Sequence, residues 1–274
     1  MTPDEARTRT ALAYNAAADA YDDEVNAYWD RFGRRTVDRL QLRPGDRVLD
    51  VCCGAGASAI PAAEAVAPDG RVLGIDLAEN LLVRARAKAR HRRLTNIEFR
   101  TGDMLESGLD SARFDAVVCV FGVFFVPDMP AAVGELWRLV RPGGRLAITT
   151  WGPRLFEPAS GCFWRAVQAV RPDLFKAFNP WDRLTEPPLV RELFRDVEPS
   201  TLDVVAETGT HPLRSPDDFW MIVLGSGYRG TIEQLDEPGR SSVRARTLAD
   251  LASAATDRIE TNVVYAVATK AGVA

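Results

Sequence analysis

Short apolar runs alternate with helical segments through the middle of the chain. Five runs have the length of buried strands, and they span residues 47–52, 71–76, 97–101, 114–119 and 145–150. Three segments between them read as helices, and they span residues 57–66, 79–92 and 130–140. Strands that are buried on both faces and separated by helices predict a parallel, doubly wound α/β sheet, in which ligands bind at the carboxyl ends of the strands.

The pattern before the first of these strands is helical. Four large apolar side chains recur at spacings of four, three and four, which places them on one face of a helix: Tyr21, Val25, Tyr28 and Phe32. Pro44 and Gly45 then end the helical pattern. We therefore expect residues 1–45 to form an N-terminal helical cap on the sheet.

After Trp151 the composition shifts, and repeated prolines interrupt any long helix. Apolar runs at 201–208 and 261–269 predict two more strands, and a helix that begins at Ser215 lies between them. The sheet is therefore expected to have seven strands and to be mostly parallel. The chain divides into a core, comprising 46–150, 201–210 and 261–274, and lid segments that set ligand specificity, comprising 151–200 and 211–260.

Composition narrows the possible partners. The chain has 34 Lys and Arg residues against 38 Asp and Glu, a formal net charge of −4, whereas nucleic-acid binding favours a surplus of positive charge. No apolar run reaches about 18 residues, and the polar start is unlike a signal peptide, so we expect a cytoplasmic protein with no membrane insertion. Four cysteines and two histidines form no spaced cluster, which predicts reduced thiols and no metal site. The oligomeric state is left open.

The first predicted strand ends in an acid and a glycine-rich turn. Asp50 is followed by Gly54 and Gly56, which permit a tight turn and let a ligand approach the backbone. The helix after the turn offers unpaired amides at its N-terminus. Asp76 ends the second strand, where a carboxylate can accept hydrogen bonds from both hydroxyls of a ribose. The sequence therefore predicts a nucleotide cofactor at this edge of the sheet.

Two classes of cofactor fit this turn. Gly54, Gly56 and Ala59 have the spacing of a nicotinamide dinucleotide motif, which would suit an NAD-dependent oxidoreductase. Asp50 would repel a pyrophosphate, however, and would attract the ammonium and sulfonium groups of S-adenosylmethionine. The chain also lacks a Tyr-x-x-x-Lys motif for hydride transfer. These features favour S-adenosylmethionine.

At this point the sequence resembles a known family. Five motifs, in order over about 100 residues, look like those of class I S-adenosylmethionine-dependent methyltransferases of the broad type that includes ubiquinone and menaquinone biosynthesis methyltransferases. They are VLDVCCGAG (48–56), GIDLAENLL (74–82), GDM (102–104), FDAVVC (114–119) and LVRPGGRLAITTW (139–151). The resemblance implies a Rossmann-like methyltransferase fold.

The resemblance also assigns roles to the residues of the sheet edge. Asp50 and the amides of Gly54 and Gly56 are implied to hold the methionine part of the cofactor. Asp76 is implied to bind the ribose, and Leu77 to flank the adenine.

Further cofactor contacts are implied by the next two strands. Asp103 is implied to accept a hydrogen bond from the adenine amino group, with the Met104 amide beside it. Val120 or Phe121 is implied to supply carbonyl and apolar contacts near the sulfonium. Cys52 stands where the family usually has the first glycine of its loop, so its side chain is expected to crowd that turn.

The N-terminal segment YNAAADAYDD (14–23) is similar to the helix that these enzymes often fold over the cofactor. The resemblance implies that the Tyr14 hydroxyl donates a hydrogen bond to the cofactor carboxylate, and that Tyr21 belongs to the same site. A position in the protein core is the alternative for Tyr21, because it shares the apolar helical face.

The implied function is methyl transfer by in-line displacement to a small-molecule acceptor. The sulfonium is already reactive, so the protein has mainly to align the reactants and exclude water. Aromatic residues near the site favour a largely apolar acceptor and methylation at oxygen or carbon. His211 is a candidate general base for a hydroxyl acceptor, with a structural histidine as the alternative. A non-catalytic or repurposed protein that keeps the fold and the cofactor is the second interpretation, and an NAD-dependent oxidoreductase the third.

Overall fold

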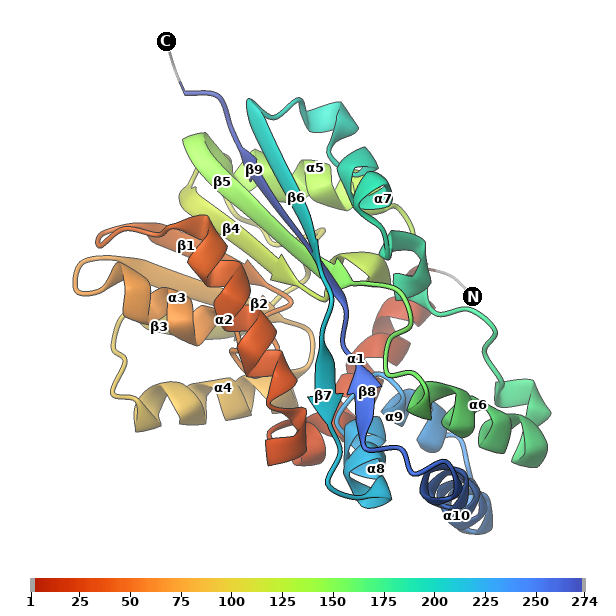
Figure 1. The fold of residues 1–274 in the computed structure, drawn as a ribbon. Coiled ribbons are helices and arrows are strands. Elements are labelled where there is room, and N and C mark those ends of the chain that lie inside the picture. Colours follow the sequence, from red (N-terminus) through yellow and green to blue (C-terminus); the bar gives the residue numbers. More distant parts are fainter. Residues whose placement is uncertain (1–2, 273–274) are drawn as a thin grey trace.

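The computed structural model describes residues 3–272, and its central feature is a seven-stranded sheet (Figure 1). The strand order is β3-β2-β1-β4-β5-β9-β6. The strands are β1 (Arg47–Val51), β2 (Arg71–Asp76), β3 (Ile97–Thr101), β4 (Phe114–Val120), β5 (Val140–Trp151), β6 (Thr201–Glu207) and β9 (Val263–Thr269). A separate two-stranded sheet pairs β7 (Thr210–Pro212) with β8 (Arg258–Glu260).

The direction of the strands confirms a doubly wound, mostly parallel sheet. The first five strands pair in parallel, and only β9 runs antiparallel to its neighbours β5 and β6. The order reverses beside β1, since β2 and β4 lie on its two sides. A crevice at such a reversal is where ligands bind in open α/β sheets.

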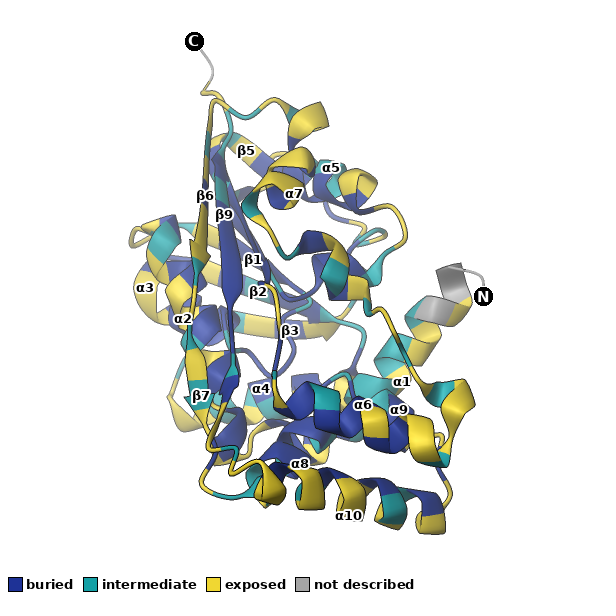
Figure 2. Ribbon diagram, turned by 45° about the vertical axis from the view of Figure 1, so that its right-hand side comes forward, coloured by how far each residue is buried: buried dark blue, intermediate teal, exposed yellow. Residues whose placement is uncertain are grey.

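Helices cover both faces of the sheet. Helices α2, α3 and α4 lie against one face and α5 and α7 against the other, while α1 packs with α8 and α9 near the carboxyl ends of the strands (Figures 1 and 2). Helices α6 and α10 pack together beyond them. The bounds are α1 (Pro3–Tyr21), α2 (Tyr28–Leu40), α3 (Ala59–Val66), α4 (Glu79–His91), α5 (Met129–Leu139), α6 (Ala159–Val170), α7 (Pro187–Glu192), α8 (Pro216–Leu224), α9 (Arg229–Ile232) and α10 (Glu237–Ser253).

The N-terminal region is two helices, not the single helical face that the apolar spacing predicts. After Tyr21 the chain leaves the helix, and the Asp23 side chain accepts a hydrogen bond from the Val25 amide to start a short 3-10 turn. An aspartate that caps the next turn competes with continuation of the helix before it. The four predicted apolar residues are nevertheless all buried, so the spacing predicts their burial correctly although it misses the break between the helices.

Smaller differences concern the ends of elements. Asp128 caps α5, because its side chain accepts a hydrogen bond from the Ala131 amide. The helix ends at Leu139, before Pro142, and β5 already begins at Val140. Ser215 precedes α8 but makes no capping hydrogen bond with its side chain.

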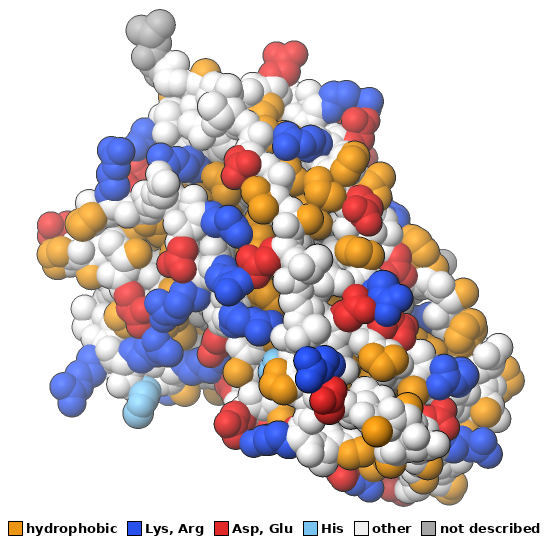
Figure 3. All heavy atoms as spheres, in the orientation of Figure 1, with side chains coloured by type: hydrophobic (Ala, Val, Ile, Leu, Met, Phe, Trp, Pro, Cys, Tyr) orange, Lys and Arg blue, Asp and Glu red, His pale blue; other side chains and the backbone are white. Residues whose placement is uncertain are grey.

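The outer surface of α2 carries a group of basic side chains, with acidic side chains among them (Figure 3). Arg35 and Arg39 both form ion pairs with Glu207 of β6, and Arg34 pairs with Glu64 of α3. These pairs connect α2 with its neighbours. No helix among residues 3–272 is long and apolar enough to span a membrane.

The inner surface of α2 touches the glycine-rich turn through Gly33. A Cβ atom at this position would lie 2.3 Å from the carbonyl oxygen of Ala57 and 2.8 Å from the amide nitrogen of Ser58, both of which are backbone atoms. Backbone cannot move aside as a flexible side chain can. Only glycine therefore allows α2 to lie this close to the turn.

We expect Gly33→Ala to lower the stability of the protein. Overpacking costs about 1–3 kcal/mol, which corresponds to a fall of roughly 2–4 °C in Tm for each kcal/mol in a chain of this size. Gly134→Ala is the matched control, because Gly134 lies in α5 with no atom within 4 Å of the added Cβ, and alanine there should stabilise the helix. Thermal unfolding curves that shift in the same direction for both variants would contradict the role of Gly33.

Candidate active site

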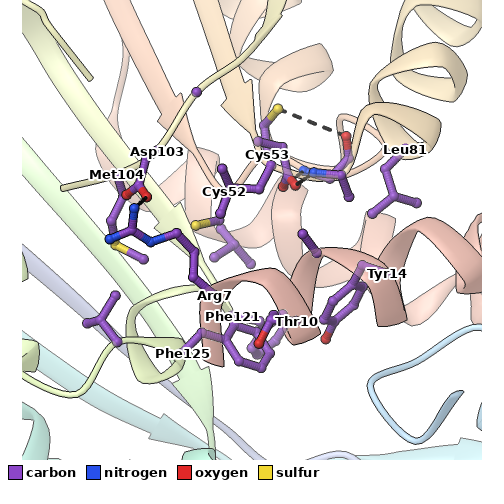
Figure 4. A pocket seen from close by; sticks show the side chains of 18 of the residues that line it. Arg7, Thr10, Tyr14, Cys52, Cys53, Leu81, Asp103, Met104, Phe121 and Phe125 are labelled. Carbon is purple, nitrogen blue, oxygen red and sulfur yellow. Dashed lines mark hydrogen bonds and ion pairs between the residues drawn. The ribbon is translucent and has the colours of Figure 1, made fainter. Parts of the chain in front are cut away.

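A cavity of about 130 Å³ lies at the carboxyl ends of the strands (Figure 4). The turns after β1, β2, β3 and β4 form one wall, and α1 crosses the opposite side. The structure brings most of the predicted site residues together in its lining, namely Tyr14, Tyr21, Cys52, Gly54, Asp76, Leu77, Asp103, Met104, Val120 and Phe121. Five segments that are distant in the sequence thus meet at one cavity.

Asp50 lies directly behind this wall and is completely buried. Its Oδ2 accepts a hydrogen bond of 2.7 Å from the Ser58 hydroxyl, and Ser58 itself lines the cavity. Its Oδ1 has no hydrogen-bond partner among the residues that the structure describes. Burial raises the pKa of the Asp50 carboxyl to about 7, although the Ser58 hydrogen bond opposes the rise. A hydrogen bond from the Ala59 amide also opposes the rise, so Asp50 is a buried acid that titrates near neutral pH behind the cavity lining.

Asp76 organises the turn as well as facing the cavity. Its Oδ2 accepts a hydrogen bond of 2.8 Å from the Gly54 amide, and its Oδ1 accepts one of 2.8 Å from the Ala78 amide. Burial raises the pKa of the Asp76 carboxyl, and these backbone hydrogen bonds oppose the rise. The carboxylate therefore connects the turn after β1 to the start of α4. The sequence indicates a ligand contact for Asp76 but carries no sign of this structural role.

The glycine-rich turn contains three residues in the left-handed region of backbone conformation. They are Cys52 with a φ of 56°, Gly54 with 50° and Gly56 with 87°. Gly56 faces away from the cavity. A cysteine in this region is strained, which agrees with the expectation that Cys52 replaces a glycine. A hydrogen bond with Cys119 and burial raise the pKa of the Cys52 thiol, so it stays protonated.

Asp103 forms an ion pair with a residue of α1 that the sequence patterns do not identify. Arg7 of α1 forms an ion pair of 2.9 Å with the Asp103 carboxylate, beside Met104 (Figure 4). Further along α1, the Asn15 side chain accepts a hydrogen bond of 2.9 Å from the Asn80 amide of α4. α1 is therefore fastened to the cofactor wall at two points. An arginine in a polar helix carries no motif that would have revealed this contact.

The two predicted tyrosines of α1 face different parts of the cavity. A Cβ added to Gly54 would lie 3.3 Å from the Tyr21 hydroxyl, which places Tyr21 over the glycine-rich turn. A Cβ added to Gly227 would lie 3.4 Å from the Tyr14 hydroxyl, which places Tyr14 beside the loop between α8 and α9. Burial raises the pKa of both phenols.

The remaining wall is aromatic and apolar. Trp29 stacks on Tyr21 with a centroid distance of 5.2 Å, and Phe125 meets the Tyr14 ring edge-on at 5.6 Å. Phe121 stacks on Trp151 at 3.8 Å. Polar groups of the sheet edge thus face a surface made largely of rings.

His211 is not part of this cavity. It lies on β7, where its ring packs edge-on against Tyr28 at a centroid distance of 5.4 Å. Burial, and to a smaller extent Arg31, lower the pKa of its imidazole. Its predicted role as a general base therefore has no support from the geometry, and it stays a prediction.

The acceptors in the cavity fit S-adenosylmethionine. The oxygens of Asp76 each keep a lone pair for a ribose hydroxyl. Asp50 lies behind the lining, where its negative charge, next to Ser58, suits an ammonium group on the cavity side. Asp103 offers a carboxylate to the adenine amino group if Arg7 shares it. No cluster of metal-ligating side chains occurs among the described residues.

Comparison with known proteins supports the same cofactor. Residues 48–144 match the family described as Methyltransferase domain. The chain is 35% identical over 173 residues to nocamycin O-methyltransferase from Saccharothrix syringae, a match covering 62% of each chain. It is 30% identical over 190 residues to demethylmenaquinone methyltransferase from Listeria monocytogenes, covering 65% of this chain and 80% of the relative. The match thus spans less than two thirds of the nocamycin enzyme's length.

A solved structure gives the same picture of the fold. The YcgJ protein from Bacillus subtilis superposes with a TM-score of 0.57 over 89% of this chain and all of its own, at 15% identity, which concerns the fold alone. The cofactor of the matched family is S-adenosylmethionine, which decides against the nicotinamide alternative. The chain belongs to the class I S-adenosylmethionine-dependent methyltransferases.

Proposed function

We propose that the protein transfers the methyl group of S-adenosylmethionine to a small, largely apolar acceptor, with oxygen or carbon as the favoured accepting atom. The observation that carries this proposal is the two-sided cavity. Its sheet side holds acids that suit the polar parts of the cofactor, and its opposite side holds rings that suit an apolar molecule. The names of the two relatives, which refer to nocamycin and demethylmenaquinone, support a small organic acceptor.

The residues would act by binding and alignment. The cofactor supplies a methyl group that its sulfonium charge already activates. The ammonium, ribose and adenine groups would be bound by Asp50, Asp76 and Asp103, respectively. The backbone turn at Gly54 would contact the methionine part of the cofactor. Val120 and Phe121, at the end of β4, would bound the reacting centre, while Phe125 and α1 exclude water from it.

The segments outside the core would choose the acceptor. We propose the division into a cap at 1–45, a core, and lid segments at 151–200 and 211–260, because residues of the cap and of the loop between α8 and α9 meet at Tyr14. Loops and appended helices at the carboxyl ends of strands commonly carry specificity.

Methyl transfer is tested directly with the purified protein and cofactor labelled in its methyl group. Phenols, quinols and polyketide-type compounds should include at least one that gains the label. If calorimetry shows that the cofactor binds while no label reaches any of these acceptors, the non-catalytic or repurposed alternative would replace methyl transfer.

The predicted base role of His211 has its own test. If His211 removes a proton from a hydroxyl acceptor, His211→Ala should lower kcat by about 10² with little change in cofactor affinity. His91→Ala is the control, since His91 is the other histidine and lies exposed at the end of α4. A loss of less than about tenfold would leave His211 as a packing partner of Tyr28.

A further inference from the structure

Tyr14 and Tyr21 belong to the same helix, but their hydroxyls lie in different surroundings. Both come from α1 and both line the cavity. The Tyr21 hydroxyl lies over the glycine-rich turn, near where an added Cβ of Gly54 would be. The Tyr14 hydroxyl lies beside the loop that contains Gly227, although burial raises its pKa and Asp76 and Cys52 are close enough for their charges to add to the rise. The different neighbours of the two hydroxyls suggest different ligands.

The surroundings of the Tyr14 hydroxyl belong to the lid side of the molecule. An added Cβ at Gly227 would lie 3.4 Å from this hydroxyl and 3.9 Å from the Trp181 ring. Phe125 packs edge-on against the Tyr14 ring at 5.6 Å. These neighbours are apolar rings and a glycine, and they come from segments that follow β4 and β5 in the chain. None of them forms part of the glycine-rich turn.

The hydroxyl also lacks a partner within the protein. Tyr14 makes no side-chain hydrogen bond with any residue between 3 and 272 in the structure. Its oxygen is not sealed into the core but opens to the cavity, so a bound ligand can reach it and accept a hydrogen bond from it. Burial raises the pKa of the phenol, with the charge of Asp76 adding to the rise, and the hydroxyl therefore stays protonated as a donor.

We propose that the Tyr14 hydroxyl donates a hydrogen bond to an oxygen atom of the methyl acceptor, and that it belongs to the acceptor site rather than the cofactor site. This inference rests on the proposed function. It narrows the acceptor class to aromatic or enolic compounds that carry a hydroxyl or carbonyl oxygen at or beside the atom that accepts the methyl group. One neutral hydrogen bond of this kind corresponds to about a three- to tenfold preference in binding.

The test compares two probes that differ only in one oxygen. Equilibrium dialysis measures the binding of 2-naphthol and of naphthalene to the full chain saturated with S-adenosylhomocysteine. The wild type should prefer 2-naphthol by about three- to tenfold beyond the solubility difference of the two probes, and Tyr14→Phe should abolish this preference. Tyr14→Phe keeps the ring against Phe125, so the fold is expected to survive.

Tyr21→Phe is the matched control, since it removes the other hydroxyl of α1. It should weaken binding of S-adenosylhomocysteine in calorimetry and retain the preference for 2-naphthol, whereas Tyr14→Phe should leave the cofactor affinity unchanged. A wild type without the preference, or a Tyr14→Phe variant that keeps it and binds the cofactor more weakly, would overturn the inference. Failure of the wild type to bind S-adenosylhomocysteine at all would instead overturn the proposed function.

Discussion

At about pH 8, Asp50→Asn should bind S-adenosylmethionine roughly ten- to a hundredfold more weakly than the wild type. A hydrogen bond between charged groups contributes about 1.5–3 kcal/mol, and an asparagine keeps the shape of the side chain without its charge. The family resemblance implies that Asp50 holds the methionine part of the cofactor, and its carboxyl lies behind the lining next to Ser58. Calorimetry with the purified protein measures the change.

The same residue should make cofactor binding depend on pH. Burial holds the pKa of Asp50 at about 7 in the free protein, so the carboxyl is neutral below that pH and charged above it. Wild-type affinity should therefore rise as the pH increases from about 6 to about 8, whereas the affinity of Asp50→Asn should stay constant. Asp203→Asn, which changes an exposed acid of β6, is the control and should keep the wild-type profile. A wild-type profile as flat as that of Asp50→Asn would contradict this role.

The stability of the free protein should fall as the pH rises, whereas its affinity for the cofactor should increase. The folded pKa of Asp50 lies above that of an unfolded chain, so its contribution to the stability of the free protein is fully present below about pH 4 and is lost as the pH rises through about 7. Above that pH the buried charge destabilises the free protein. Asp50→Asn should therefore be the more stable protein near pH 8 without cofactor, although it binds the cofactor less well.

Asp76→Ala should weaken cofactor binding by about ten- to a hundredfold and should also lower Tm. The first effect follows from the loss of hydrogen bonds between the carboxylate and the ribose. The second follows from the amides of Gly54 and Ala78, which lose their shared acceptor when the side chain is removed. Calorimetry with S-adenosylhomocysteine and thermal unfolding of the same samples separate the two effects.

Glu79→Gln is the control for Asp76, because it removes a nearby charge that pairs with Arg86 and Thr101 on the surface. It should leave cofactor affinity close to that of the wild type. If Asp76→Ala lowered Tm but left the dissociation constant unchanged, Asp76 would be a structural residue of the turn only.

Much of this arrangement can be predicted because it depends on local sequence. Short apolar runs between helical segments identify buried strands, and in a parallel sheet their carboxyl ends share one edge. The acid that ends β2 and the acid that follows β3 must therefore lie near the turn after β1. For this reason the pattern places Asp76 and Asp103 at the same edge of the sheet, and the family resemblance implies their roles there.

The parts that could not be predicted depend on contacts across the fold. Apolar spacing gives the buried face of a helix but not the point where an aspartate such as Asp23 starts a new turn. The ion pair of Arg7 joins α1 to a loop that follows β3, and nothing in its local sequence marks it. The direction of the Tyr14 hydroxyl depends on the loop that contains Gly227, more than 200 positions further along the chain.

The contacts that hold α1 in place have a consequence for the release of product and cofactor. Arg7 and Asn15 attach this helix to the wall against which the cofactor is expected to lie, so a bound cofactor is enclosed beneath it. On the proposed function the acceptor touches the same helix from the lid side, through Tyr14. The methylated product would then leave from the lid side while α1 stays attached, whereas opening of both contacts would help release the spent cofactor. Each catalytic cycle would thus end with the detachment of α1, and the next would begin when a fresh cofactor allows it to close.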